Sequence, residues 1–407
     1  MDAPASVVIV GAGQAGGWAA KTLRDAGFAG RVTLIGDEAH PPYERPPLSK
    51  GVLAGARAPE TTHLFKGAAF ENFNLDWRAG VRVVRIDRER RRVELDAGEP
   101  ATYDRLILCT GGRARALDVP GAGEAGVRTL RSIDDSLAMH AAMGDARALL
   151  VIGGGWIGLE VAATARKRGL EVRVVEFAPR LGARVLPPAI SDALRALHER
   201  EGTLIETGRS VQRFDRTAGG RGAATLDDGR VVEADLVVAG IGLVPNDELA
   251  RSAGLACTPA GVVVDAQCRT SDAAIFAAGD LAVTPNRAAR ASVRLESWQN
   301  AQDQGIAAAK AALGQDVRYD PLPRFWSDQY DASVHMLGWI EPTQALVMRG
   351  DPATLKFTAY ALDDGRVRGF CAFNAARDIR PSRKLIESGT TVEAAKLADP
   401  TVDLATL

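Results

Sequence analysis

Residues 6–16 read Ser-Val-Val-Ile-Val-Gly-Ala-Gly-Gln-Ala-Gly, an apolar run followed by a glycine-rich turn. An apolar run without alternation is typical of a strand whose sheet is covered by helices on both faces. Gly11 permits the tight turn, Gly13 lets backbone approach a pyrophosphate, and Gly16 lets the next helix pack closely on the strand. The N-terminus of that helix would offer N–H groups and a positive dipole to phosphates. The segment therefore predicts a dinucleotide-binding fold.

An acidic residue stands where such a fold binds ribose. Asp37 ends the next apolar strand, about 20 residues after the turn, where a carboxylate can accept a hydrogen bond from a ribose hydroxyl. Residues 6–38 thus read as strand, glycine turn, helix and strand.

The same pattern returns at residues 147–177, which contain Gly153-Gly154-Gly155-Trp156-Ile157-Gly158. Gly153, Gly155, Ile157 and Gly158 are the expected nucleotide contacts of this second turn. Glu176 ends the following strand; its carboxylate can accept from a 2′-hydroxyl and repels a 2′-phosphate, which favours NADH over NADPH.

Two arginines follow Glu176 closely. Arg180 and Arg184 could bind a phosphate, and the alternative is that both belong to a solvated face.

Two dinucleotide folds in one chain predict two dinucleotides, and the obvious pair is FAD with a nicotinamide nucleotide. The predicted fold class is α/β, with two Rossmann-like domains and a C-terminal α+β domain. Residues 1–112 and 242–322 are assigned to the FAD-binding domain, and residues 113–241 to the NAD-binding domain. Residues 323–407 form the third domain, because alternating patterns over 325–339 and 354–373 predict antiparallel strands before a helical tail.

Composition excludes several classes of protein. The 407 residues carry a net charge of −1, which gives no reason to expect nucleic acid or an acidic membrane as partner. The four cysteines form no C-x-x-C pair and the five histidines show no ligand spacing, so we expect no metal. The first strand begins by about Ser6, which leaves no room for a signal peptide, and no apolar run is long enough to span a membrane. We therefore expect a cytoplasmic protein.

Four further segments carry a resemblance over essentially the whole chain. They are Arg45-Pro46-Pro47-Leu48-Ser49-Lys50, residues 270–280, residues 295–301 and residues 325–329. With them the chain resembles the FAD-dependent NADH:ferredoxin reductase components of bacterial Rieske oxygenase and cytochrome P450 systems, within the glutathione reductase superfamily.

The resemblance implies roles for matching residues. The expected FAD contacts are Ala15, Asp37, Arg45, Lys50, Val83, Arg131, Asp280 and Trp298. By the same resemblance, Lys50 and Glu160 form a pair beside flavin N5, and Trp326 lies near the isoalloxazine on the nicotinamide side. The C-terminal domain would cover the flavin and form part of the ferredoxin surface.

Physical chemistry gives these residues both functional and ordinary interpretations. The charge of Lys50 could stabilise a reduced flavin anion, or Lys50 could be a surface lysine. Glu160 lies in an apolar helix and needs a partner if it is buried, for which Lys50 is the candidate. Trp298 and Trp326 could instead be core aromatics.

The resulting hypothesis is an enzyme that passes a hydride from NADH to FAD and then single electrons to a [2Fe–2S] ferredoxin, of Rieske type by preference. The protein would be a monomer or a homodimer. A rubredoxin or monodehydroascorbate reductase, or a redox-sensing flavoprotein like apoptosis-inducing factor, remains an alternative. A disulfide reductase needs a C-x-x-x-x-C near the first flavin loop, and residues 40–55 contain no cysteine.

Four arginines suggest where a ferredoxin would dock. Arg287, Arg290 and Arg294 precede Trp298, and Arg324 precedes Trp326. A basic rim at these positions would steer an acidic ferredoxin, and solvated arginines are the alternative.

Overall fold

The computed structural model describes residues 4–407, which form two compact units. Of the described residues, the first unit comprises 4–46, Ala58–Arg113 and Leu243–Leu322. The second comprises Pro47–Arg57, Ala114–Gly242 and Pro323–Leu407. Each unit is therefore built from segments that are distant in the sequence.

The first unit contains a five-stranded parallel sheet with the order β19-β7-β1-β2-β3. Its strands are β1 (Ser6–Val10), β2 (Arg31–Gly36), β3 (Asp76–Ala79), β7 (Arg105–Leu108) and β19 (Ile275–Ala277). In β1, Val7 and Ile9 belong to one core cluster, and Val8 and Val10 belong to another. Because alternate residues of a strand face opposite sides, the sheet is buried on both faces, as the continuous apolar run predicts.

Helices α1 (Gln14–Asp25) and α6 (Trp298–Ala312) cover one face of this sheet, where Ala19 and Ala308 join the cluster of Val7. The opposite face packs on smaller sheets and a short helix. These elements are β4 (Val83–Asp87), β5 (Arg92–Leu95), β6 (Ala101–Thr102), α5 (Glu248–Ser252), β17 (Cys257–Thr258), β18 (Gly261–Val263), β20 (Ala282–Asn286) and β21 (Ala291–Val293). The short strands β8 (Gly112–Ala114) and β16 (Leu243–Pro245) pair with each other.

The second unit repeats this plan with a four-stranded parallel sheet of order β11-β10-β9-β15. Its elements are α2 (Ile133–Asp145), β9 (Ala148–Ile152), α3 (Trp156–Lys167), β10 (Glu171–Glu176), α4 (Pro188–Arg200), β11 (Leu204–Thr207) and β15 (Leu236–Ala239). An antiparallel layer of β12 (Val211–Arg216), β13 (Gly222–Leu226) and β14 (Val231–Ala234) packs against Leu150 and Ile152 of β9. The helices pack on the other face, beside Leu149 and Val151.

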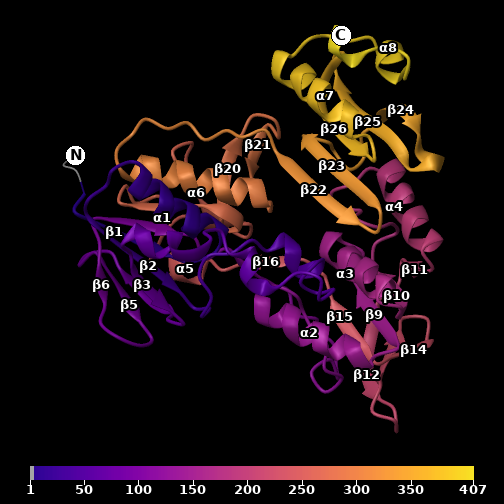
Figure 1. Cartoon of the computed structure of the whole chain (residues 1–407), viewed down its shortest axis with the longest axis horizontal. Coiled ribbons are helices and arrows are strands. Elements are labelled where there is room, and N and C mark those ends of the chain that lie inside the picture. Colours follow the sequence, from indigo (N-terminus) through magenta and orange to yellow (C-terminus); the bar gives the residue numbers. More distant parts are fainter. Residues whose placement is uncertain (1–3) are drawn as a thin grey trace. The chain divides into compact units, whose positions relative to one another are not determined.

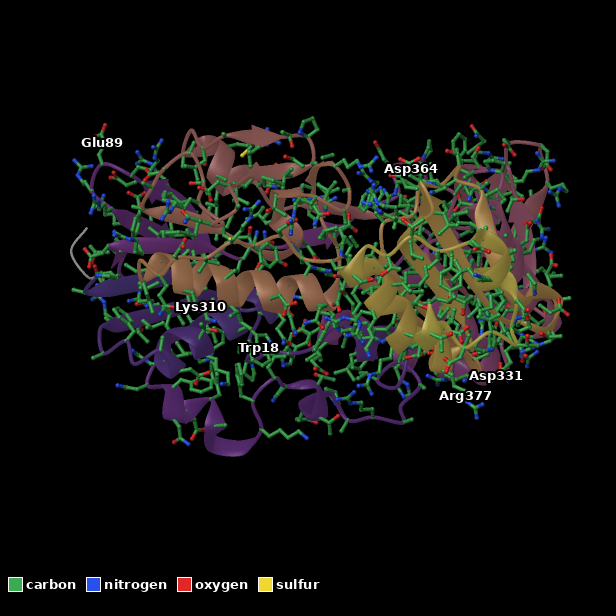
Figure 2. All side chains as sticks on the ribbon, turned by 90° about the horizontal axis from the view of Figure 1, so that it is seen from above. Trp18, Glu89, Lys310, Asp331, Asp364 and Arg377 are labelled. Atoms are coloured by element: carbon green, nitrogen blue, oxygen red, sulfur yellow. The ribbon has the colours of Figure 1, made fainter. Side chains whose placement is uncertain are left out.

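The last part of the second unit is an antiparallel sheet of order β22-β23-β26-β25-β24 (Figure 1). It contains β22 (Arg324–Gln329), β23 (Ala332–Gly338), β24 (Leu346–Asp351), β25 (Lys356–Asp363) and β26 (Arg366–Phe373). Helix α7 (Ala376–Ser388) ends at Gly389, whose φ of +65° suits glycine, and α8 (Ala394–Ala398) follows. Figure 2 shows exposed polar side chains over this region, including Asp331, Asp364 and Arg377.

The predicted α/β fold, with two glycine-turn parallel sheets and antiparallel C-terminal strands, is confirmed. Strand β24 was not predicted, and residues 231–242 contain the two strands β14 and β15. The structure groups Pro323–Leu407 with Ala114–Gly242 in one compact unit, so the separation into three domains stays a prediction. Within residues 4–407, no helix is both long and apolar enough to cross a membrane.

Candidate active site

The two glycine turns have the same backbone geometry. Gly11 and Gly153 both adopt a φ of +101°, which L side chains rarely adopt. A Cβ on Gly16 would lie 1.9 Å from the Gly11 carbonyl oxygen, and a Cβ on Gly158 would lie 2.2 Å from the Gly153 oxygen. The first glycine of each motif is therefore required by its backbone conformation, and the third by the close packing of helix on strand.

The packing around the middle glycine of each turn would allow a larger side chain. A Cβ on Gly13 would meet nothing closer than 3.9 Å, and a Cβ on Gly155 nothing closer than 3.8 Å. These glycines are the N-cap residues of α1 and α3, and glycine has no side chain that could cap the helix. Uncapped first-turn N–H groups beside a bare backbone suit the pyrophosphate of a dinucleotide.

The acid predicted for each nucleotide lies just after or at the end of its strand. Asp37 follows β2, and its half-exposed carboxylate forms an ion pair of 3.3 Å with Arg82. Glu176 ends β10, and its carboxylate accepts hydrogen bonds from the backbone N–H of Gly154 at 2.5 Å and of Ala178 at 2.7 Å. Glu176 is thus held directly against the second glycine turn.

The two arginines after Glu176 differ in their surroundings. The Arg180 guanidinium donates to the carbonyl oxygens of Ala183 at 3.1 Å and Pro342 at 3.2 Å, and also to Leu186 and Ser191. Arg184 is exposed and lies beside the backbone of Gly242. Arg180 therefore has a structural role, and Arg184 is the better placed of the two to meet a phosphate.

Ala15, Asp280 and Trp298 are brought together in the first unit. Helix α6 approaches α1 so closely that a Cβ on Gly305 would lie 2.3 Å from the Ala15 carbonyl oxygen. Asp280 lies in a short helical turn that begins at Gly279, and a Cβ on Gly279 would lie 3.2 Å from the Ala15 side chain. Trp298 is the first residue of α6, after the N-cap Ser297.

Two other predicted residues of the first unit, Arg45 and Val83, lie in a loop and in a strand. The Gln14 amide oxygen, in the orientation that satisfies both indoles, accepts from Trp298 at 3.1 Å and Trp18 at 3.3 Å. Arg45 forms an ion pair of 2.7 Å with Glu38, and its guanidinium is the nearest group to Gly13. Val83 begins β4 and is buried. Trp298 is therefore tied to the turn residue Gln14.

In the second unit, Lys50 and Glu160 form the ion pair that the sequence suggested. Lys50 Nζ lies 2.7 Å from Glu160 Oε2, and the Glu160 side chain is only 4% exposed. Glu160 comes from α3, two residues after Gly158, and Lys50 follows a short helical turn at Pro46–Ser49. Arg131 belongs to the same unit, and its backbone N–H donates to Asp135 at the start of α2. The buried carboxylate has the charged partner that burial requires.

Two serines complete the environment of Glu160, and sequence reasoning missed them. Ser49 Oγ donates to Glu160 Oε2 at 2.5 Å, and Ser327 Oγ donates to Oε1 at 2.6 Å. Both serines lie inside the segments that carried the resemblance, next to Lys50 and Trp326. No spacing rule links residues that meet only through the fold.

The aromatic residues of β22 approach the second glycine turn. Phe325 packs against Trp156, the first residue of α3, with ring centroids 4.7 Å apart. Trp326 is the next residue along β22, opposite His335 on β23. Strand β22 thus contributes Phe325 and Ser327 to the surroundings of α3.

No group of three or more His, Cys, Asp or Glu side chains within residues 4–407 could hold a metal ion. Burial raises the pKa of the Cys109 thiol to about 12, so this cysteine is an inert part of the core.

The chain belongs to the pyridine nucleotide-disulphide oxidoreductase family, which matches residues 5–305; residues 324–407 match the family described as reductase C-terminal. This confirms the recognised family and the oxidoreductase class. The chain is 41% identical over 400 residues, 98% of both sequences, to the anthranilate 1,2-dioxygenase system ferredoxin–NAD(+) reductase component of Burkholderia cepacia. It is 40% identical to rhodocoxin reductase of Rhodococcus erythropolis, over 98% of this chain and 93% of the relative. Putidaredoxin reductase, solved in a covalent complex with putidaredoxin, superimposes with a TM-score of 0.94 at 37% identity, covering 99% and 98% of the two chains.

Proposed function

We propose that this chain is an NADH:ferredoxin oxidoreductase that binds FAD and NADH. The observation that carries the proposal is the repeated glycine turn, with a φ of +101° at its first glycine in each unit. Each turn leaves uncapped helix N–H groups beside its middle glycine, which fits the pyrophosphate of one dinucleotide. The names of the relatives supply the electron acceptor, a ferredoxin.

FAD is assigned to the first turn, in a domain of residues 1–112 and 242–322, and NADH to the second turn, in residues 113–241. Glu176 supports NADH, because a 2′-phosphate beside its carboxylate would be repelled. A 2′-phosphate would need a positive counter-charge. The Arg180 guanidinium does not offer one, because it already donates hydrogen bonds to backbone carbonyl groups. Gly153, Gly155, Ile157 and Gly158 then line the NADH site, with the exposed Arg184 at its edge.

When bound, FAD would supply the redox chemistry, accepting two electrons and passing them on singly. The chain's own residues bind and orient. Lys50 would place its positive charge where negative charge develops on reduction, and its ion pair with Glu160 would hold it there. Ala15, Asp37, Arg45, Val83, Arg131, Asp280 and Trp298 are assigned to FAD, with Trp326 near its nicotinamide side.

The ferredoxin is proposed to carry a [2Fe–2S] cluster of Rieske type, and the enzyme to be a monomer or a homodimer. Residues 323–407 are proposed to form part of the docking surface. A rubredoxin or monodehydroascorbate reductase uses the same hydride chemistry, so the acceptor assay separates these alternatives. A redox-sensing flavoprotein would show slow turnover with every acceptor.

The test is to purify the protein, identify its flavin and assay acceptors one at a time. We expect about one FAD per chain, no replacement by FMN, and ferredoxin-dependent reduction of cytochrome c by NADH. A protein that stays colourless after FAD is added would overturn the proposal. Fast reduction of rubredoxin or monodehydroascorbate, with none of any ferredoxin, would retain the flavin chemistry and reject the acceptor.

A further inference from the structure

A buried chain of polar side chains leads away from Glu160 through the second unit. Ser327 donates to Glu160 Oε1 at 2.6 Å, and Gln329 Nε2 donates to Ser327 Oγ at 3.0 Å. Gln329 Oε1 lies 2.7 Å from His198 Nε2. Ser327 and His198 are fully buried, and Gln329 is 1% exposed.

Three separate elements build this chain. Ser327 and Gln329 are two residues apart on β22, so both side chains point to the same face of that strand. Glu160 comes from α3 and His198 from α4. The alternation of β22 therefore connects two helices of the parallel sheet through hydrogen bonds.

The ion pair with Lys50 sets the direction of every bond in the chain. A carboxylate accepts and does not donate, so the Ser327 hydroxyl proton points at Glu160 and its oxygen accepts from Gln329. The Gln329 carbonyl can only accept, so His198 carries its proton on Nε2. Burial lowers the pKa of His198 to about 4, so the ring is neutral and Nδ1 accepts from the Tyr330 hydroxyl at 3.3 Å.

All these donors point towards Glu160, and bonds aligned in one direction strengthen one another. Burying serine, glutamine and histidine costs stability relative to apolar residues of similar size. This series of hydrogen bonds is not suited to proton transfer, because a glutamine amide does not titrate near neutral pH. Its effect is to hold the Glu160 carboxylate in one orientation, and with it the Nζ of Lys50.

We propose that Ser327, Gln329 and His198 are positioning residues, which fix the Lys50–Glu160 pair for hydride transfer. This inference rests on the proposed function, in which the pair lies beside the flavin. It adds three residues from two elements outside the glycine motifs, none of which touches the reacting atoms.

The test uses stopped-flow reduction of the flavin by NADH in the holoenzyme variants Ser327→Ala and Gln329→Met. Because the bond lost in Ser327→Ala is to a charged group, we expect its reduction rate constant to fall about tenfold, and that of Gln329→Met about threefold. The dissociation constant of NADH should change less than twofold in each, since neither residue is assigned to the nucleotide. Gln329 does not touch Glu160, so Gln329→Met carries the test if Ser327→Ala fails to fold.

Two further variants separate positioning from general damage. The double variant Ser327→Ala/Gln329→Met should equal Ser327→Ala alone, because Gln329 acts through Ser327. Ser327→Thr keeps the hydroxyl and should restore most of the rate. The matched control is Thr358→Val, which removes an equally buried hydroxyl that donates to Asp378 at 2.7 Å in the same sheet; it should leave the rate constant unchanged.

The outcomes distinguish this inference from the proposed function. If Ser327→Ala and Gln329→Met behave like Thr358→Val while Lys50→Ala is slow, the positioning chain is wrong and the proposed function stands. Independent, multiplicative effects of the two variants would also overturn the chain. If the flavin of Lys50→Ala is reduced at the wild-type rate, the proposed role of the Lys50–Glu160 pair is wrong. The positioning role of the hydrogen-bonded side chains is then wrong as well.

Discussion

Lys50 Nζ lies 2.7 Å from Glu160 Oε2, although one residue follows a proline-rich loop and the other lies inside the helix of the second glycine turn. The carboxylate is almost fully buried and receives hydrogen bonds from Ser49 and Ser327 as well. A charge buried this deeply is stable only while its partners remain. The pair therefore acts as one unit.

The first prediction follows from that unit. Lys50→Ala should slow flavin reduction by NADH at least about tenfold, because it removes a charged partner. Glu160→Ala should show a related defect, and the double variant should resemble the slower single variant. Stopped-flow absorbance measures all three rate constants. Strictly additive effects would show that the two side chains act independently.

The second prediction concerns the choice of nucleotide. Glu176 is held against the second glycine turn by the N–H groups of Gly154 and Ala178. Glu176→Ala should narrow the preference for NADH over NADPH about tenfold or more in kcat/KM, since a like charge beside the 2′-phosphate is removed. Adding Arg184→Ala to Glu176→Ala should lower kcat/KM for NADPH again, because it removes a positive charge near the 2′-phosphate. A wild-type enzyme that prefers NADPH would contradict the assignment of Glu176.

The third prediction compares two glycines of one turn. Gly158→Ala places a Cβ 2.2 Å from the Gly153 oxygen and should lower the thermal midpoint or prevent folding. Gly155 has an ordinary φ of −84° and room for a Cβ, so Gly155→Ala should fold normally. Gly155→Ala should nevertheless weaken NADH binding, because the methyl group lies where backbone is expected to meet pyrophosphate. Calorimetry and NADH titration separate the two effects; unchanged NADH affinity in Gly155→Ala would argue against this site.

The fourth prediction concerns stability at low pH. Burial lowers the pKa of His198 from 6.5 to about 4, so between these values the unfolded chain binds a proton that the folded chain does not. Stability should therefore fall as the pH drops from about 6.5 to about 4, by at most about 3 kcal/mol from this residue. His198→Gln should lose less stability over that range in urea unfolding. Parallel curves for the two proteins would show that His198 does not contribute.

The fifth prediction concerns ferredoxin docking. Arg294, one of the four arginines of the predicted basic rim, is only 13% exposed and pairs with Glu296. Its charge can therefore contribute little to attracting a ferredoxin. Arg290 is exposed. Added salt, or Arg290→Glu at low salt, should slow ferredoxin reduction and leave ferricyanide reduction almost unchanged, because exposed charges are screened beyond about 8 Å at physiological ionic strength.

Lys310 provides the matched control for this docking test. It is an exposed cation in the first unit, labelled in Figure 2, and lies about 18 Å along α6 from Trp298. Lys310→Glu should leave ferredoxin reduction unchanged. Equal effects of Arg290→Glu and Lys310→Glu would place the docking surface elsewhere.

Much of the fold was predictable because its signals are local. The continuous apolar runs before Gly11 and Gly153 specify strands buried on both faces, and the glycine spacing specifies the turn into each helix. Strand β24 was missed because Leu346–Asp351 reads as three apolar residues followed by Arg, Gly and Asp, with no alternation of apolar and polar residues. The tail was predicted to be helical, and within it Gly389 ends α7 before α8 begins at Ala394.

The amino-acid sequence by itself determined the two dinucleotide turns, their acids Asp37 and Glu176, and the suggestion that a buried Glu160 needs Lys50, since each depends on neighbours in the chain or on a general cost of burial. Only the tertiary structure decided which side chains satisfy Glu160. Ser327 reaches Glu160 because β22 packs beside α3. His198 is connected to Glu160 through Gln329, because α4 brings its ring against the same face of β22. Hydrogen bonds form over about 3 Å, and distance along the sequence does not report such proximity.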